Sequence, residues 1–366
     1  MKKTKQSELL LPLLTAVILA LGGLLLCLFP VPRFSAAENR LLADKPTFSW
    51  QALWQGEYTA AWERYTAERL TGRDALRAVH ATCEIALGKK ESGGVILCTD
   101  RTLAARPQPS TALLKRNLIG IAALTEACRE RALPCTVAFV PCRAEGRRAV
   151  LPASYTASAT KTLCEALKNQ GEAPIAFESL TADSAWFHTD HHWTAAGSYA
   201  AYRQLAPLLG YEPYGEEAFE KISVSTDFLG TGARTAGLPL ITPDTITLWR
   251  FADDEDYHLC TNGEKTDFNG FYDFSKLNTC DGYAVFLGGN DGLLTVTRGD
   301  GDARPTLLLV RDSYAAALIP FLARHYRIVA VDPRYYRGDI AQLPEKADQV
   351  LLLAGTVTLT ESAFLR

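Results

Sequence analysis

The first hydrophobic pattern along this chain is a continuous apolar run near the N-terminus. Residues 9–31 contain no charged side chain and follow Lys2, Lys3 and Lys5. A helix of that length reaches about 34 Å, which is enough for a hydrocarbon core of about 30 Å. Lysines favour the cytoplasmic side of a membrane. The pattern predicts a cytoplasmic tail at 1–8, a transmembrane signal anchor at 9–31 and an extracellular remainder of a single-pass cell-membrane protein.

Two alternatives to an anchor stay open. Cleavable signals usually have a shorter apolar core, about 7 to 15 residues long. Ser35, Ala36 and Ala37 are small enough to form a cleavage site after such a core. Leu26-Cys27 resembles a lipoprotein signal weakly, because leucine before the cysteine is a poor fit.

The second pattern is helical. In the segment 32–95, a short polar tether precedes apolar residues that recur at the spacing of one helix face. The positions are Leu53, Trp54, Tyr58, Ala61, Trp62, Tyr65, Leu70, Leu76, Val79 and Ile85. This segment is expected to be a helical membrane-proximal region.

The third pattern, over residues 96–366, alternates short apolar runs with helical spacing. Strands are predicted at 95–98, 135–140, 175–177, 283–287, 306–310, 328–331 and 350–354. Helices are predicted at 112–132, 157–170, 194–209 and 314–326. Continuously apolar strands that alternate with helices are typical of a parallel sheet covered on both faces. We therefore expect an α/β, flavodoxin-like domain.

Residues 210–302 differ from the rest of this domain. Glycines, aromatic residues and acidic residues predominate there, and helical periodicity is lost. Short alternating runs such as 246–251 predict irregular or antiparallel structure. We expect an insertion in the α/β domain.

Composition narrows the class of partner. The 366 residues include 38 Lys+Arg and 41 Asp+Glu, for a net charge of −3, and 48% are hydrophobic. This hydrophobic fraction excludes a disordered chain. The even charge balance excludes a basic surface over the whole molecule, so we expect no nucleic-acid partner.

The nine cysteines leave two interpretations open. Eight lie outside the N-terminal run and could form disulfides in an oxidising compartment, with Cys260 and Cys280 the first pair to test. Buried thiols are the other interpretation, since Cys98 and Cys135 lie in apolar runs. No CxxC spacing occurs, which argues against a zinc ribbon.

Two short segments carry candidate chemistry. His188-Thr189-Asp190-His191-His192-Trp193 holds three of the six histidines and precedes a predicted helix. Arg311-Asp312-Ser313-Tyr314 follows an apolar strand. A serine in a strand-to-helix turn lies at the carboxyl edge of the sheet, where open α/β sheets bind ligands.

A serine nucleophile needs a neutral imidazole, and that imidazole needs a carboxylate. Asp190, His192 and Ser313 form such a set. In an extended segment Asp190 and His192 would point to one side and His191 to the other. The alternatives are that Ser313 only caps a helix, or that His188, Asp190, His191 and His192 bind a metal. Adjacent histidines seldom share one ion and no HExxH spacing occurs, so we expect no metal and no cofactor.

The chain resembles the DHHW protein family of Gram-positive bacteria. Besides the motif itself, several segments carry the resemblance: 37–42, 73–74, 228–230, 283–290, 311–314 and 319–321. That family in turn resembles the SGNH-hydrolase-like components of alginate and cellulose O-acetylation. The resemblance implies that Asp190 orients, His192 is the base and Ser313 is the nucleophile. It also implies that the substrate is a cell-surface polysaccharide.

The oxyanion hole and the substrate contacts have several candidate residues. Gly288-Gly289-Asn290 resembles the Gly and Asn blocks of SGNH enzymes, but it could merely form a turn. Arg311 stands where ordinary SGNH esterases have glycine, and it could anchor a sugar carboxylate or form a structural ion pair. The remaining candidates for this part of the site are Tyr314, His191 and Trp193.

Two functions from different classes follow. The first is an extracellular serine O-acetyltransferase or acetylesterase. A single span cannot carry acetyl groups across a bilayer, so a transferase would need a multi-span membrane acyl-donor protein. The alternative is a non-catalytic glycan-binding or scaffold protein of a cell-envelope assembly. Exposed aromatic residues would carry that function, and the candidates are Trp186, Trp249, Tyr272 and Tyr335.

Overall fold

The computed structural model describes residues 2–28, 33–35, 40–156, 159–177, 180–299 and 301–365. The chain divides into two compact units. The first comprises residues 1–89 and 237–239, and the second comprises residues 90–236 and 240–366. Of the predicted features, residues 29–31 of the apolar run and Ala36 and Ala37 of the alternative cleavage site lie outside the described residues.

The first unit is helical, as its apolar spacing predicts. Its helices are α1 (Lys2–Leu28), α2 (Trp50–Trp54), α3 (Glu57–Glu68) and α4 (Arg73–Ala86), and its strands are β1 (Phe34–Ser35) and β2 (Arg40–Leu41). Gly56 and Gly72 precede α3 and α4 with φ of 78° and 76°, a left-handed conformation that glycine adopts without steric cost.

Among the described residues, no helix combines the length and the apolar content that a membrane span requires. The predicted transmembrane anchor at 9–31 is therefore not supported.

The second unit is built on a mixed sheet of eight strands in the order β11-β10-β12-β14-β13-β15-β6-β7. Five neighbouring strands run parallel: β14 (Arg327–Val331), β13 (Thr306–Arg311), β15 (Gln349–Gly355), β6 (Cys135–Val140) and β7 (Ile175–Ala176). The α/β class with a central parallel sheet is confirmed.

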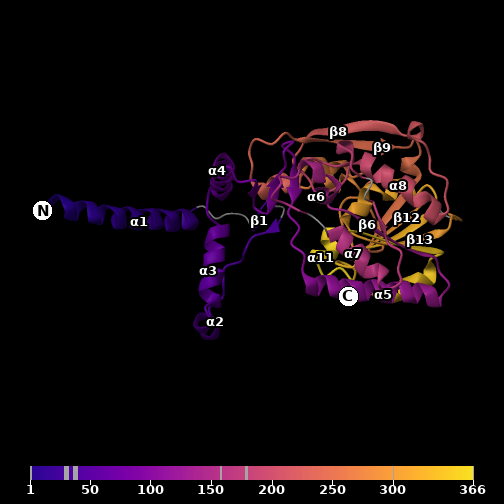
Figure 1. The fold of residues 1–366 in the computed structure, drawn as a ribbon, viewed down its shortest axis with the longest axis horizontal. Coiled ribbons are helices and arrows are strands. Elements are labelled where there is room, and N and C mark those ends of the chain that lie inside the picture. The colour runs from indigo at the N-terminus through magenta and orange to yellow at the C-terminus, as the bar shows by residue number, and fades with distance from the viewer. Residues whose placement is uncertain are drawn as a thin grey trace. The chain divides into compact units, whose positions relative to one another are not determined.

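Side chains of the parallel strands alternate between two cores. Leu307 and Leu309 of β13 face the core that includes α8 (Ala195–Leu209) and α10 (Ile319–Leu322). Leu308 and Val310 face the core that includes α5 (Thr111–Glu130), α7 (Ala159–Lys168) and α11 (Thr356–Glu361). Figure 1 shows α5, α7 and α11 together on one side of the sheet. Burial on both faces explains why these strands are continuously apolar.

The antiparallel structure predicted for residues 210–302 is confirmed, and part of it extends the central sheet. The strands β10 (His258–Thr261), β11 (Glu264–Lys265) and β12 (Leu293–Thr297) add antiparallel to the β14 edge. In β12, Leu294 and Val296 are buried and alternate with partly exposed residues, so the strand packs on one face only. The antiparallel hairpin of β8 (Glu220–Phe228) and β9 (Asp244–Arg250) forms a separate sheet, and α9 (Thr231–Ala236) lies in the connection between its two strands.

The predicted strand at 95–98 is confirmed: Val95–Leu97 (β4) pairs with β3 (Glu91–Ser92) and β5 (Leu103–Ala105) in a small antiparallel sheet. Two other local predictions are corrected. The predicted strand at 283–287 is a 3-10 helix (η6, Gly282–Val285), buried on all sides, which explains its apolar run. In place of a helix at 314–326 there is a 3-10 turn (η7, Ser313–Ala317) before the short α10. Pro320 cannot donate an N–H, so it fits only the first turn of α10.

The remaining short helices connect these elements. They are α6 (Arg143–Gly146), η1 (Arg148–Val150), η2 (Asp183–Ala185), η3 (Glu216–Ala218), η4 (Asp254–Asp256), η5 (Phe274–Asn278) and η8 (Ile340–Lys346).

Of the cysteines, Cys260 is a free thiol in this structure, so the predicted pair with Cys280 is not formed. Cys98, Cys128 and Cys142 are buried thiols, as the second interpretation expects.

Candidate active site

Ser313 lies in the turn between β13 and η7, at the carboxyl edge of the parallel strands. Asp312, the N-cap residue, accepts a hydrogen bond from the Tyr314 N–H at 3.0 Å. Its second carboxylate oxygen accepts bonds from the Gly355 N–H and the Thr358 hydroxyl, both at 2.7 Å. Through these hydrogen bonds, Asp312 connects the turn to the end of the neighbouring strand β15. Ser313 itself stays partly exposed, within reach of a ligand.

The structure brings Asp190 and His192 to Ser313, 121 residues later in the chain. His192 Nε2 lies 2.8 Å from Ser313 Oγ, and His192 Nδ1 lies 2.5 Å from Asp190 Oδ1. A carboxylate can only accept, so Nδ1 carries the proton and Nε2 is left to accept from the serine hydroxyl. The imidazole is thus in the tautomer that a general base needs.

A turn, rather than an extended segment, joins Asp190 to His192. The Asp190 carboxylate accepts the His192 backbone N–H at 2.9 Å, an Asx-turn that folds the motif back on itself. The prediction that His191 points away is therefore wrong. Its Nδ1 lies 3.6 Å from Asp190 Oδ1, and its ring packs against His192.

The Asp190 side chain is ionised at neutral pH. Burial alone would raise its pKa, but the positive charges of His191 and His192 and the hydrogen bonds from His192 outweigh burial and leave the pKa far below its ordinary value. The Thr231 N–H donates to the second oxygen of Asp190 at 2.7 Å. A fixed negative charge beside Nδ1 stabilises the imidazolium that forms when His192 takes a proton.

Gly230 gives a structural reason for the segment Phe228-Leu229-Gly230, which is one of the segments that carry the DHHW resemblance. A Cβ atom at Gly230 would lie 2.3 Å from the Cβ of Asp190, far inside van der Waals contact. Only glycine lets the start of α9 approach closely enough for Thr231 to donate to Asp190. The Gly230 N–H in turn donates to the Thr189 hydroxyl at 2.9 Å.

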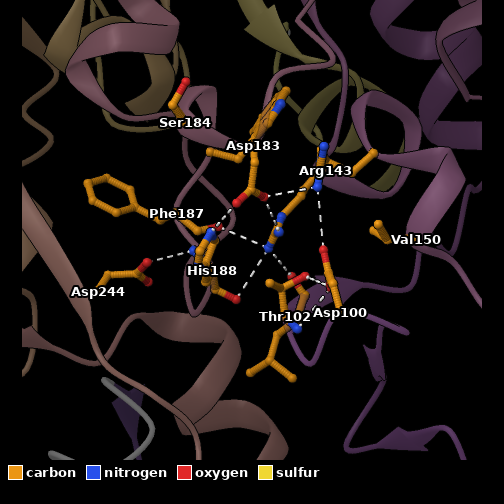
Figure 2. Close-up of polar contacts among 12 residues, drawn as sticks. Asp100, Thr102, Arg143, Val150, Asp183, Ser184, Phe187, His188 and Asp244 are labelled. Atoms are coloured by element: carbon orange, nitrogen blue, oxygen red, sulfur yellow. Dashed lines mark hydrogen bonds and ion pairs between the residues drawn. The ribbon is translucent and has the colours of Figure 1, made fainter.

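Two buried charged residues hold the backbone just before the motif, and sequence analysis missed both (Figure 2). Asp244 accepts the N–H groups of His188 and Thr189 at 2.8 and 2.7 Å, and also the Thr189 hydroxyl at 2.6 Å. From the other side, Arg143 donates to three carbonyl oxygens, those of Leu103, Phe187 and His188, at 3.0 to 3.3 Å.

One of these two residues carried a signal that sequence analysis could have used. Arg143 begins the short helix α6 just beyond the end of the buried strand β6, at the carboxyl edge where sites form. Asp244 carried none, because it is one of many acidic residues between 210 and 302.

Two rings enclose the His192 imidazole. Tyr283 stacks on it almost in parallel, with centroids 3.7 Å apart and an interplanar angle of 4°. His191 lies 3.9 Å from it at 36°. Two rings this close cannot share one face, so His192 is sandwiched between them. Burial and the neighbouring His192 charge lower the pKa of His191 to about 4, so His191 is neutral at pH 7.

Several predicted substrate contacts are structural instead. Trp193 is fully buried and donates its indole N–H to the Tyr314 carbonyl at 2.9 Å. Tyr314 is also buried, and its hydroxyl donates to the His191 carbonyl at 2.8 Å. Arg311 is fully buried and donates to Asn290 Oδ1 at 2.6 Å, so it is not placed to anchor a sugar carboxylate. Asn290 is exposed and Gly289 partly exposed.

Asp190, His191 and His192 form a group that could hold a metal ion, with potential ligand atoms within 4.8 Å of one another. Both nitrogens of His192 already have partners, in Asp190 and Ser313. A metal bound through His192 would have to break one of these two contacts. The arrangement therefore suits proton transfer better than metal binding.

Residues 168–332 match the model of the DHHW protein family. The predicted DHHW resemblance is confirmed. A comparison with curated protein sequences gave no match. The matched DHHW region includes the Asp190–His192 turn, the β8–β9 hairpin and Ser313.

Solved structures share the fold. A DHHW family protein from Eubacterium siraeum is 18% identical, with 74% of this chain and 94% of that chain covered and a TM-score of 0.60. PatB1 of Bacillus cereus is 15% identical, with 74% and 98% covered and a TM-score of 0.61. PatB1 with a sulfonyl adduct gives a TM-score of 0.59 at 15% identity, with 74% of this chain and 97% of that chain covered. At such identities the likeness is one of fold.

Proposed function

We propose that this protein is a serine-dependent O-acetyltransferase or acetylesterase that acts on a polysaccharide outside the cell. One observation carries the proposal: the continuous chain of contacts from Asp190 through His192 to Ser313, at 2.5 and 2.8 Å. The DHHW resemblance supports it. So does the sulfonyl adduct of PatB1, because sulfonyl reagents modify activated nucleophiles and PatB1 has a similar fold.

The first half of the reaction forms an acetyl-enzyme. Ser313 Oγ attacks the carbonyl carbon of an acetyl ester, and its proton passes to His192 Nε2. The tetrahedral intermediate collapses, and the leaving alcohol takes that proton back from His192. The imidazolium that exists between these two steps is stabilised by the charge of Asp190.

The second half transfers the acetyl group. A sugar hydroxyl or water enters, His192 removes its proton, and attack on the acetyl-Ser313 ester releases the product. The serine oxygen then regains the proton from His192, so atoms and charges balance. If the acceptor is a sugar, a separate multi-span membrane protein would supply the acetyl donor.

A neutral sugar is the proposed substrate class. The net charge of −3 gives no basic surface for a polyanion. Arg311, the one cation considered as an anchor for a sugar carboxylate, is fully buried and bonded to Asn290. Binding of the sugar would therefore rest on hydrogen bonds and ring contacts.

The non-catalytic alternative receives less support from the structure. Of its four candidate aromatic residues, Trp186, Trp249 and Tyr272 are buried, and Tyr335 alone is exposed, at 52%. One exposed ring is a weak basis for a glycan-binding surface. This alternative predicts glycan retention on an affinity column without covalent labelling at Ser313.

The chemistry is tested with p-nitrophenyl acetate and a sulfonyl fluoride. Wild-type protein should hydrolyse the ester and gain one sulfonyl group at Ser313, located by peptide mass spectrometry. Ser313→Ala should lose about 10³-fold or more of kcat/KM and all labelling at that peptide. The exposed Ser275→Ala is the matched control and should behave as wild type. Equal rates for wild type and Ser313→Ala would remove Ser313 from the mechanism.

A further inference from the structure

Residues 187–189, just before Asp190, belong to no helix or strand. Backbone N–H and C=O groups that are shielded from water need hydrogen-bond partners, which a sheet would supply along a strand. In this segment side chains supply most of them. Arg143 and Asp244 together bind two of its carbonyl oxygens and two of its N–H groups.

Arg143 and Asp244 bind opposite ends of the same two peptide groups (Figure 2). In the peptide between Phe187 and His188, the arginine Nη1 donates to the oxygen at 3.1 Å and the carboxylate Oδ1 accepts the N–H at 2.8 Å. In the peptide between His188 and Thr189, the corresponding distances are 3.3 Å to Nη1 and 2.7 Å to Oδ2. Both peptide groups therefore have a cation at the oxygen and an anion at the N–H.

The two charges are buried, since Arg143 is 2% and Asp244 7% exposed. A buried charge is costly unless opposite charges or dipoles balance it. Here each peptide dipole has its oxygen toward the cation and its N–H toward the anion, so each hydrogen bond polarises the group and strengthens the other. Among the described residues, Nε and Nη2 of Arg143 have no hydrogen-bond partner. The hydrogen bonds that hold this guanidinium are the ones to backbone oxygens.

We infer that Arg143 and Asp244 act together as positioning residues, which fix these two peptide groups and so keep the triad aligned. This inference rests on the proposed function and deepens it. The link to the triad continues through Thr189, the neighbour of Asp190. Its hydroxyl donates to Asp244 at 2.6 Å and accepts the Gly230 N–H at 2.9 Å. Because both charged side chains are buried, they act through the backbone and not on the substrate.

Substitution of Arg143 is the first test. Arg143→Met fills similar space but cannot donate, so both peptide groups lose the support at their oxygens. With p-nitrophenyl acetate, kcat should fall about 10²-fold while KM changes less than about twofold, because displaced catalytic groups slow the chemistry without removing substrate contacts. Arg143→Lys should recover about tenfold of that loss, since an ammonium can donate to the same oxygens.

Two results with these variants would overturn the inference. One is a folded Arg143→Met that keeps at least half of the wild-type kcat. The other is an Arg143→Lys that is no faster than Arg143→Met, because a residue that only fills space gains nothing from a donor.

A double-mutant cycle tests whether the two charges act on the same peptide groups. Asp244→Asn leaves one oxygen acceptor and places an amide NH₂ against a peptide N–H, so kcat should fall by about 10-fold or more. Arg143→Met combined with Asp244→Asn should be slower than the worse single variant by no more than about threefold, since both changes release the same two groups. Losses that multiply in full would contradict a joint action.

Arg324 offers a matched control, because its side chain is also buried and is paired with the carboxylates of Asp253 and Asp254. Arg324→Met should lose stability, measured by thermal unfolding, but keep the wild-type kcat. A fall in kcat equal to that of Arg143→Met would assign the effect to stability and overturn the inference. If Arg143→Met does not fold, Asp244→Asn decides, and a wild-type kcat in that variant would overturn the inference.

Labelling of Ser313 by a sulfonyl fluoride separates this inference from the proposed function. Labelled wild type together with a folded and fully active Arg143→Met would refute the positioning role alone. Wild type that is not labelled, and that hydrolyses p-nitrophenyl acetate no faster than Ser313→Ala, would refute the proposed function instead.

Discussion

The His192 imidazole is confined on both faces, with Tyr283 stacked on one and His191 packed on the other. A general base must hold one ring orientation while its charge changes, and stacked rings prevent the ring from turning. Burial and the nearby Asp190 carboxylate raise the pKa of Tyr283 well above its ordinary value, so Tyr283 stays neutral beside His192. An aromatic face also favours the imidazolium over neutral imidazole.

This role of Tyr283 can be measured. Tyr283→Ala should lower kcat about 10-fold or more while KM changes little, because substrate contacts remain but the ring of His192 loses its support. Tyr283→Phe keeps the stack and should stay within about twofold of wild type, although it loses the hydroxyl contact to the Ser313 carbonyl at 3.4 Å. Ester hydrolysis under steady-state conditions checks both. Equal losses in the two variants would assign the effect to the hydroxyl instead.

Among the elements, the turn between β8 and α9 contacts the triad directly without supplying a triad residue. It brings the Thr231 N–H to Asp190, and it depends on the absence of a side chain at Gly230. Asp244, at the start of β9, holds the opposite side of the motif through His188 and Thr189. The β8–β9 hairpin and α9 therefore shape the site without contributing a reacting atom.

Gly230→Ala tests the contact between this turn and Asp190. The added Cβ would meet Asp190 at 2.3 Å, so either the turn or Asp190 must shift. We expect a loss of about 1–3 kcal/mol in the free energy of unfolding and a fall in kcat/KM on the order of 10²-fold. Denaturant unfolding and ester hydrolysis measure the two effects.

Gly215→Ala is the matched control for this prediction. Its Cβ would meet only the flexible carboxylate of Glu217, and Gly215 has an ordinary φ of −73°. Wild-type activity in Gly230→Ala would show that the contact between the turn and Asp190 is not needed.

The pH stability of the whole molecule depends on half-buried histidines that stay neutral in the folded state. Burial, with the charges of Arg304 and Arg324, lowers the pKa of His325 to about 4. His325 lies in an aromatic cluster, stacked on Tyr211 at 4.4 Å and accepting the Tyr202 hydroxyl at 2.7 Å. An unfolded histidine has a pKa of about 6.5. Between these two values the unfolded chain binds the extra proton, so stability falls as the pH drops from about 6.5 to 4.

His325→Phe should weaken this pH dependence. The phenyl ring keeps the stack but cannot take a proton, so the slope of unfolding free energy between pH 4.5 and 6 should fall by about 1 kcal/mol per pH unit. His191, with its pKa also lowered to about 4, contributes to the remaining slope. Urea unfolding of wild type and His325→Phe at several pH values measures the slope of the unfolding free energy against pH. The exposed His80→Gln is the control, and an unchanged slope in His325→Phe would contradict the assignment.

Much of the fold could be predicted from local sequence. Strands β6, β13, β14 and β15 are continuously apolar because both faces are buried, and α8 begins where Thr194 caps it. The 283–287 run could not be assigned in this way. An apolar segment buried on every side has no period, so a 3-10 helix and a strand look the same in sequence.

Local sequence was enough to predict the parallel strands, the helices α5, α7 and α8, and the residue types that meet at Asp190, His192 and Ser313. Each of these depends on contacts within a short stretch or on chemistry that few residues provide. Long-range packing places β12 in the sheet, turns Arg311 toward Asn290 and brings Asp244 to the motif. Those outcomes depend on which distant segments pack together, and packing partners far apart in the chain leave no local pattern.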